Sequence, residues 1–201
     1  VGGSYYTPGL IVDDIVASVP GRGQILDPCC GTGQFLLAFA ERVGDPLALV
    51  GCDIDGLAVH IARINLMMAF PDIDFKPRVY RSDFLLEGLP EEEIGDGFSM
   101  IATNPPWGLH YARPDLGRLK ALFPEISSLE SFSYMLKRSI DLAREGGSIS
   151  FILPESILSV KTHHDIRQYI LERARIRRII RLGRVFKNVF TPVIRLDLEK
   201  G

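Results

Sequence analysis

The chain has 201 residues, of which 46% are hydrophobic and 24% are charged, so it indicates one globular domain and excludes a disordered chain. No apolar run approaches the roughly 20 residues of a bilayer span, and we expect no membrane partner. The formal net charge of −2 is unevenly spread, with 9 basic and 18 acidic side chains in residues 1–135 and 14 basic and 7 acidic ones in residues 136–201.

Apolar runs of strand length alternate with segments of helical period, which is typical of a parallel sheet covered by helices on both faces. A first helix is expected to begin with Thr7 as its N-cap and Pro8 at its first position. Further helices are predicted at 34–43, 56–70, 131–144 and 163–173, and strands at 24–26, 47–52, 76–81, 98–102, 148–153, 176–182 and 193–198.

Two of these segments carry specific expectations. The helix at 56–70 has Leu57, Ile61, Ile64 and Met68 on one face. Residues 108–126 contain several turn residues and no sustained period, so we predict a long loop there. Together the elements predict a doubly wound α/β domain with a seven-stranded, mostly parallel sheet. In such domains ligands bind at the carboxyl ends of the strands, near the reversal of strand order.

The segment that follows the first strand, Asp27 to Phe35, is rich in small residues. Gly31 and Gly33 allow a tight turn and a close approach of the backbone to a ligand. Asp53 ends the second strand, where an acidic side chain meets a ribose diol in this topology. The third glycine of a dinucleotide-binding loop is missing, and Asp27 favours a cationic ligand over a pyrophosphate.

Polar side chains also follow the third and fourth strands. Asp83, followed by Phe84, could accept a hydrogen bond from an adenine amino group while the ring of Phe84 covers the base. After the fourth strand comes Asn104-Pro105-Pro106-Trp107, in which the two prolines stop the strand abruptly. Two rigid acceptors, the Asn104 side chain and the Pro105 carbonyl, could hold the hydrogens of a conjugated amino group and aim its lone pair at an electrophile. Trp107 would offer the ring a stacking face.

Taken in order, the motifs resemble those of the amino-terminal-motif-first class of DNA adenine-N6 methyltransferases, which includes the modification subunits of type I restriction systems. The motifs that carry the resemblance are Tyr6-Thr7-Pro8, Asp27 to Phe35, Asp53-Ile54-Asp55, Asp83-Phe84 and Asn104-Pro105-Pro106-Trp107. The resemblance implies a Rossmann-like class I methyltransferase fold, S-adenosylmethionine as methyl donor, and an adenine flipped out of double-stranded DNA as acceptor. Two residues depart from the family's usual pattern. Cys29 stands where members often carry a smaller residue, and Gly56 stands where a proline often follows the position of Asp55.

The same resemblance implies a role for each motif residue. The implied cofactor-binding residues are Tyr6, Thr7, Pro8, Asp27, Cys29, Gly31, Gly33, Phe35, Asp53, Ile54, Asp83 and Phe84. The implied catalytic residues are Asn104, Pro105, Pro106 and Trp107. Trp107 would stack on one face of the flipped base and a second aromatic on the other, for which Phe186 is the candidate and Phe190 the competitor.

Three other functions stay open at this point. The first is methyl transfer to an RNA base or to a protein glutamine, since an Asn-Pro-Pro-aromatic motif also serves those enzymes. The second is a non-catalytic DNA-binding or partner-binding subunit with the same fold. The third is a nicotinamide oxidoreductase, which the missing third glycine disfavours.

Three cysteines, Cys29, Cys30 and Cys52, form neither an even disulfide framework nor a metal-ligand set, so we expect a reduced, cytoplasmic setting and no metal site. We also expect residues 1–201 to be one catalytic domain of a longer protein, whose target recognition comes from a missing domain or from a specificity subunit. A group of basic residues near one rim has two equally favoured interpretations, a binding surface for a polyanion and an ordinary solvated surface. Its members are Arg173, Arg175, Arg177, Arg178, Arg181, Arg184 and Lys187.

Overall fold

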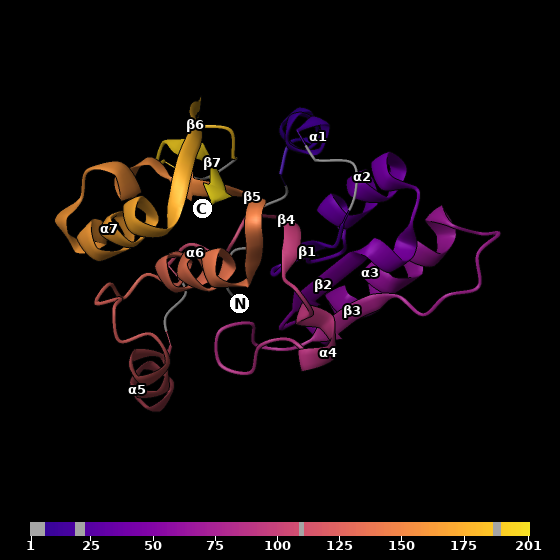
Figure 1. Ribbon diagram of the computed structural model, residues 1–201, viewed down its shortest axis with the longest axis horizontal. Coiled ribbons are helices and arrows are strands. Elements are labelled where there is room, and N and C mark those ends of the chain that lie inside the picture. Colours follow the sequence, from indigo (N-terminus) through magenta and orange to yellow (C-terminus); the bar gives the residue numbers. More distant parts are fainter. Residues whose placement is uncertain (1–6, 19–22, 109–110, 187–189) are drawn as a thin grey trace.

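The computed structural model describes residues 7–18, 23–108, 111–186 and 190–201 (Figure 1). Seven strands form one sheet in the order β3-β2-β1-β4-β5-β7-β6. All neighbouring pairs from β3 to β5 are parallel, and β7 runs antiparallel to both β5 and β6. The strands are β1 (Ile25–Asp27), β2 (Leu49–Asp53), β3 (Arg78–Arg81), β4 (Phe98–Thr103), β5 (Ala143–Pro154), β6 (Ala174–Gly183) and β7 (Val193–Lys200).

Helices cover the sheet in two groups. Helix α1 contacts α2, and α2 contacts α3, while α6 and α7 contact each other (Figure 1). The helices are α1 (Gly9–Ala17), α2 (Gln34–Val43), α3 (Gly56–Ala69), α4 (Glu91–Ile94), α5 (Arg113–Leu122), α6 (Ser131–Leu142) and α7 (His164–Arg173), with 3-10 turns at Pro46–Ala48, Glu155–Leu158 and Lys161–His163. Within the described ranges, no helix is both long and apolar enough to cross a bilayer.

The hydrophobic core is divided between the two faces of the sheet. Ile25 belongs to the core cluster that includes residues of α1, α2 and α3, and its neighbour Leu26 belongs to the cluster that includes residues of α5, α6 and α7. Successive residues of a strand point to opposite faces, so each layer of helices has its own core. The predicted fold class, a doubly wound seven-stranded α/β domain, is confirmed.

The strand order reverses beside β1. From β1 the chain first builds β2 and β3 on one side, and then returns to place β4 on the other side. The carboxyl ends of β1 and β4 therefore lie next to each other at the point where open α/β sheets bind ligands.

The predicted loop at 108–126 is wrong, because it contains helix α5. This helix has a proline in its first turn, but Leu119 is its only buried residue. With one residue facing the core, the segment shows little helical period, which is the signal that a sequence pattern can detect.

The predicted apolar face of α3 exists but does not face the core. Leu57, Ile61, Ile64 and Met68 are exposed, and the helix buries Val59, Ala62 and Leu66 instead. The sequence of α3 is apolar on most of its circumference, so periodicity alone could not choose the buried side.

The start of one helix and the start of one strand also differ from the prediction. Helix α1 begins at Gly9 with Pro8 in the N-cap position and no side-chain cap, so Thr7 does not cap it. The residues before β2 form a 3-10 turn, Pro46–Ala48, in which Asp45 accepts a hydrogen bond from the Leu47 N–H at 2.9 Å. Because Thr7 does not cap α1, its hydroxyl is available for another contact.

Candidate active site

Four polar side chains stand at the carboxyl ends of four adjacent strands. Asp53 and Asp27 are the last residues of β2 and β1, Asn104 directly follows β4, and Asp83 lies two residues beyond β3. Because these strands are neighbours and parallel, their ends lie along one edge of the sheet. The structure thus arranges the four predicted positions in the spatial order Asp83, Asp53, Asp27, Asn104.

The turn between β1 and α2 depends on its two glycines. Gly31 has φ +52° and Gly33 has φ +91°, both in the region that disfavours L side chains. A Cβ added to Gly33 would lie 3.2 Å from the Cβ of Ala62 on α3, so Gly33 also lets α2 and α3 approach closely. A Cβ at Gly31 would meet no atom within 4 Å, and this side of the turn is open.

Asp53 holds the glycine turn in place. One carboxylate oxygen accepts from the Gly31 N–H at 2.8 Å, and the other accepts from the Asp55 N–H at 2.9 Å. A carboxylate has about four lone-pair positions, so these two bonds leave acceptor capacity for hydroxyl groups of a ligand. Asp53 fits the predicted contact to a ribose diol.

Asp27 is buried, with 1% of its surface exposed. Burial raises the pKa of Asp27 to about 7; the Thr103 side chain and the Cys29 N–H oppose the shift, and the nearby charge of Asp53 adds to it. The Cys29 N–H donates to Asp27 Oδ1 at 3.1 Å. A carboxyl group in this environment gains from a cationic partner, because the partner would offset the cost of burying its charge.

Three predicted cofactor residues pack into the protein. The Cys29 thiol lies 3.6 Å from the sulfur of Met135, and burial raises the pKa of that thiol. The rings of Phe35 and Phe84 are buried in the two cores. The Arg138 guanidinium lies over the ring of Phe84, 5.3 Å from the ring centroid. Both rings are therefore part of the core rather than of an open binding surface.

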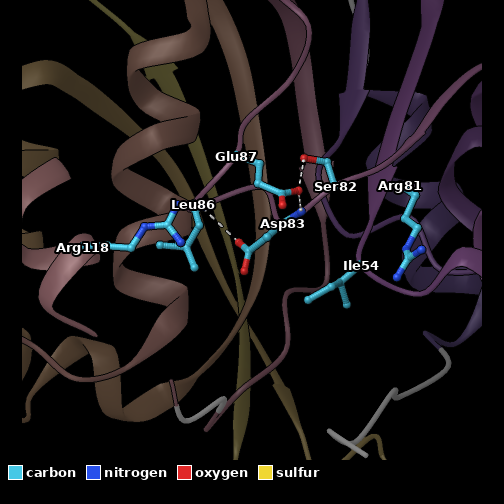
Figure 2. A pocket seen from close by; sticks show the side chains of 7 residues that line it. All are labelled: Ile54, Arg81, Ser82, Asp83, Leu86, Glu87 and Arg118. Atoms are coloured by element: carbon cyan, nitrogen blue, oxygen red, sulfur yellow. Dashed lines mark hydrogen bonds between the residues drawn. The ribbon is translucent and has the colours of Figure 1, made fainter. Parts of the chain in front are cut away.

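A pocket of about 420 Å³ lies between the ends of β2 and β3, and it contains the predicted residues Ile54 and Asp83 (Figure 2). Asp83 Oδ1 accepts from the N–H groups of Leu85 at 2.9 Å and Leu86 at 3.1 Å. The full lining is Ile54, Arg81, Ser82, Asp83, Leu86, Glu87 and Arg118. Leu86 supplies the apolar wall that the sequence assigned to Phe84.

Sequence reasoning missed several residues of this pocket. In Figure 2, Arg118 and Arg81 extend on opposite sides of the acidic pair Asp83 and Glu87. Arg118 comes from α5, which the sequence pattern did not reveal, so no signal could have placed it there. Glu87 could have been suspected from its position four residues after Asp83, whose N–H it accepts at 3.0 Å.

The Asn104–Trp107 segment is fixed by three side-chain hydrogen bonds. Asn104 Nδ2 donates to the Thr7 hydroxyl at 3.3 Å, and the Ser131 hydroxyl donates to the Pro106 carbonyl at 2.8 Å. Trp107 Nε1 donates to the Ile152 carbonyl at 3.2 Å. Asn104 and Trp107 are half-buried, so neither side chain is sealed in the core.

Trp107 contacts the predicted second aromatic. The rings of Trp107 and Phe186 meet edge to face, with centroids 5.4 Å apart and an interplanar angle of 78°. Phe190 is exposed and belongs to neither core cluster. The structure therefore brings Phe186 to Trp107, although their edge contact does not present two parallel faces to a base.

The remaining predicted residues fall into three groups. Pro8 is the N-cap residue of α1, Pro105 is buried behind Asn104, and Tyr6 lies outside the described residues. The pocket does not include any residue of the Asn104–Trp107 segment. The site thus consists of a pocket at β2 and β3, a glycine turn at β1, and an amide with aromatic rings at β4.

The predicted basic rim lies mainly on β6, at the edge of the sheet. Several of its arginines contact acids: Arg177 pairs with Glu199 at 2.5 Å, Arg178 with Asp197 at 3.0 Å and Arg181 with Glu155 at 3.0 Å. Lys187 lies outside the described residues. These pairs reduce the charge that the rim offers to a polyanion.

Known structures share the fold of this chain. The chain superposes on a methyltransferase subunit of a type I restriction-modification system from Streptococcus thermophilus with a TM-score of 0.78 at 21% identity, covering 100% of this chain and 46% of that one. It also superposes on a Listeria monocytogenes protein assigned to the class I S-adenosylmethionine-dependent methyltransferases, with a TM-score of 0.72 at 19% identity, covering 96% and 59% of the two chains. The fold is that of a class I methyltransferase.

The amino-acid sequence identifies the family. Residues 1–201 match the family model described as N-6 DNA Methylase, and the chain belongs to that family. S-adenosylmethionine is accordingly its cofactor. The type II methyltransferase M.VspI of Vibrio sp. strain 343 is 27% identical over 201 residues, which cover 98% of this chain and 48% of that protein. The chain thus spans about half the length of this relative.

Proposed function

We propose that this domain transfers a methyl group from S-adenosylmethionine to the N6 amino group of an adenine in double-stranded DNA. The observation that carries the proposal is the position of Asn104, an amide fixed at the end of β4 directly beside the glycine turn of β1. Membership of the N-6 DNA methylase family supports the choice of the amino group and of DNA.

The residues present fit the cofactor. Gly31 leaves open space at the turn, and the buried Asp27 carboxyl group would gain from the cofactor's amino group. Asp53 retains acceptor capacity for the ribose hydroxyls. The pocket that contains Ile54 and Asp83 would hold the purine, with Asp83 accepting from its amino group and Ile54 and Leu86 against the ring.

The cofactor supplies, when bound, a methyl group on a positively charged sulfur. Asn104 Oδ1 and the Pro105 carbonyl would accept the hydrogens of the target amino group, which localises its lone pair and fixes its direction. Trp107 would stack on the base once it has left the duplex and offset part of the few kcal/mol that flipping costs. No strong general base is required, because the amine becomes acidic only as it gains the methyl group.

We infer that recognition of the DNA sequence depends on a part of the protein outside this domain. The chain covers less than half of the Streptococcus thermophilus subunit and of M.VspI. We infer that residues 1–201 form the catalytic domain, that a further domain or a specificity subunit selects the DNA site, and that the protein works in the cytoplasm. The contacts in this domain would then act on any adenine presented to it.

Replacement of Asn104 by alanine tests the proposed reaction. We expect Asn104→Ala to lower methyl transfer to DNA by about 100-fold or more, the effect of losing a preorganised hydrogen-bonding group in a transition state. The measurement is single-turnover transfer of a labelled methyl group, with cofactor affinity determined by calorimetry. Affinity should stay within about twofold, since Asn104 contacts Thr7 and not the pocket.

The matched control is Gln168→Ala, which removes an exposed amide on α7 and should leave transfer unchanged. Parallel assays with RNA and protein as methyl acceptors separate the other functions of this motif. Transfer by Asn104→Ala at the parent rate would show that the proposed role of Asn104 is wrong. Preferred methylation of RNA or of protein glutamine by the parent protein would overturn the choice of DNA.

A further inference from the structure

We propose that Thr7 is a positioning residue for the methyl transfer, and that its hydroxyl holds the Asn104 amide in place at the end of β4. The inference rests on the proposed function and assigns Thr7 a task beyond contact with the cofactor. Its basis is the hydrogen bond from Asn104 Nδ2 to Thr7 Oγ1, at 3.3 Å.

Thr7 is well placed to hold an amide in position. It is 2% exposed, so water competes little for its hydroxyl. Thr7 and Asn104 are 97 positions apart in the sequence, and their contact joins the segment before α1 to the carboxyl end of β4. Since Thr7 does not cap α1, this hydroxyl has no local task at the start of the helix.

The backbone of Thr7 is held from two sides. Gln34 Nε2 donates to the Thr7 carbonyl at 2.6 Å. Pro8 follows with φ −56°, and its ring restricts the conformation of the residue before it. The hydroxyl therefore occupies a defined position before any substrate arrives.

Helix α1, which follows Thr7, is anchored to strand β7. Asp14 of α1 forms an ion pair with Arg195 of β7, whose guanidinium is buried and also binds Asp197 at 2.7 Å. The apolar side of α1, with Val12, Ile15 and Val16, packs in the same core as α2 and α3. This packing transmits the rigidity of the sheet to Thr7.

The consequence for Asn104 follows from the chemistry of an amide. Its nitrogen is a donor and its oxygen an acceptor, on opposite sides of Cγ. When the nitrogen donates to Thr7, the oxygen is directed away from Thr7. In this arrangement the oxygen can accept from the target amino group, and the contact with Thr7 limits how far the amide can swing away from that group.

The same contact connects the two halves of the site. Gln34 is the first residue of α2, directly after the glycine turn, and its side chain binds the carbonyl of Thr7, the residue that contacts Asn104. Movement of the turn on cofactor binding would therefore reach the Asn104 amide through a path of two hydrogen bonds.

The experiment compares Thr7→Val, which keeps the shape and removes the hydroxyl, with Thr7→Ser, which keeps the hydroxyl. In the intact protein we expect Thr7→Val to lower the single-turnover rate at saturating cofactor about tenfold, and Thr7→Ser to retain most of it. Cofactor affinity by calorimetry should change less than threefold in both. Thr162→Val, at an exposed threonine, is the matched control and should match the parent protein.

A double-variant cycle tests whether Thr7 acts through Asn104. If it does, Thr7→Val should have no further effect on the rate in the Asn104→Ala background. A similar loss in both backgrounds would overturn the proposal. So would weaker cofactor binding with an unchanged rate at saturation, which would make Thr7 a cofactor ligand only.

Failure of the proposed function would look different. A parent protein that binds S-adenosylmethionine and methylates no DNA would contradict that function before any variant is compared. A parent protein that methylates DNA, together with a fully active Thr7→Val, would contradict the positioning role alone. Thermal unfolding of Thr7→Val, expected within a few degrees of the parent, separates lost orientation from lost folding.

Discussion

The carboxyl group of Asp27 has an unfavourable electrostatic environment. Its carboxyl group is buried, and burial raises its pKa to about 7 in the absence of a cation. The hydrogen bond from the Cys29 N–H recovers only part of the lost hydration. A group that is costly to ionise without a ligand is typical of a binding site, because the ligand supplies the missing charge.

This shift predicts how stability without cofactor depends on pH. The pKa of Asp27 is higher in the folded protein than its ordinary value of 3.8, so its stabilising contribution is present below pH 3.8 and is lost as the pH rises through about 7. Asp27→Asn removes this loss. We expect the variant to exceed the parent in free energy of unfolding by a few kcal/mol at pH 8 and to match it near pH 4.

Urea denaturation at several pH values measures this difference. Asp45→Asn is the matched control, because Asp45 is an exposed aspartate far from the turn, and its effect should not grow with pH in the same way. If the difference in free energy of unfolding between Asp27→Asn and the parent stayed constant from pH 4 to pH 8, the raised pKa of Asp27 would be contradicted.

At the scale of elements, α3 shows how position in the fold assigns roles to similar side chains. Leu66 packs against the sheet, while Leu57, Ile64 and Met68 on the same helix face outward. All four have comparable hydrophobicity, and the sequence of the helix does not distinguish them. The side of α3 that packs against the sheet and against α2, where Ala62 lies close to Gly33, is the side that is buried.

Two single substitutions on α3 should therefore differ strongly. Leu66 is 1% exposed and Met68 is 73% exposed. We expect Leu66→Ala to lower the free energy of unfolding by roughly 2–5 kcal/mol through lost burial and a cavity, and Met68→Ala by about 0.5 kcal/mol or less. Denaturant unfolding of both variants checks this, and equal losses would show that the buried side of α3 is misassigned.

At the scale of the whole molecule, a buried charge network joins segments from both ends of the chain. Arg195 on β7 binds Asp197 and Asp14, and its Nε also donates to the Ser150 hydroxyl at 3.2 Å. The network connects α1 to β5 and β7, and so connects the segment with Thr7 to the sheet that carries Asn104. Its loss should affect both folding and the site.

Arg195→Ala should lower the free energy of unfolding by roughly 3–5 kcal/mol, because it leaves Asp197 near the sheet without its buried partner. Arg177→Ala, which removes an exposed arginine paired with Glu199, should cost about 1 kcal/mol or less. Denaturant unfolding compares the two. A loss at Arg195 no larger than that at Arg177 would mean that the network does not hold α1.

Local sequence determined much of this protein. Alternating apolar runs predicted all seven strands and most helices, and Gly31, Asp53 and the Asn104–Trp107 segment predicted the strand ends that form the candidate site, because turns and strand ends depend on neighbouring residues. The tertiary structure alone decided the contact of Thr7 with Asn104, the place of Arg118 at the pocket, and the buried side of α3. Those depend on strand order and on helices packing across the sheet, so they join residues whose local sequences carry no information about each other.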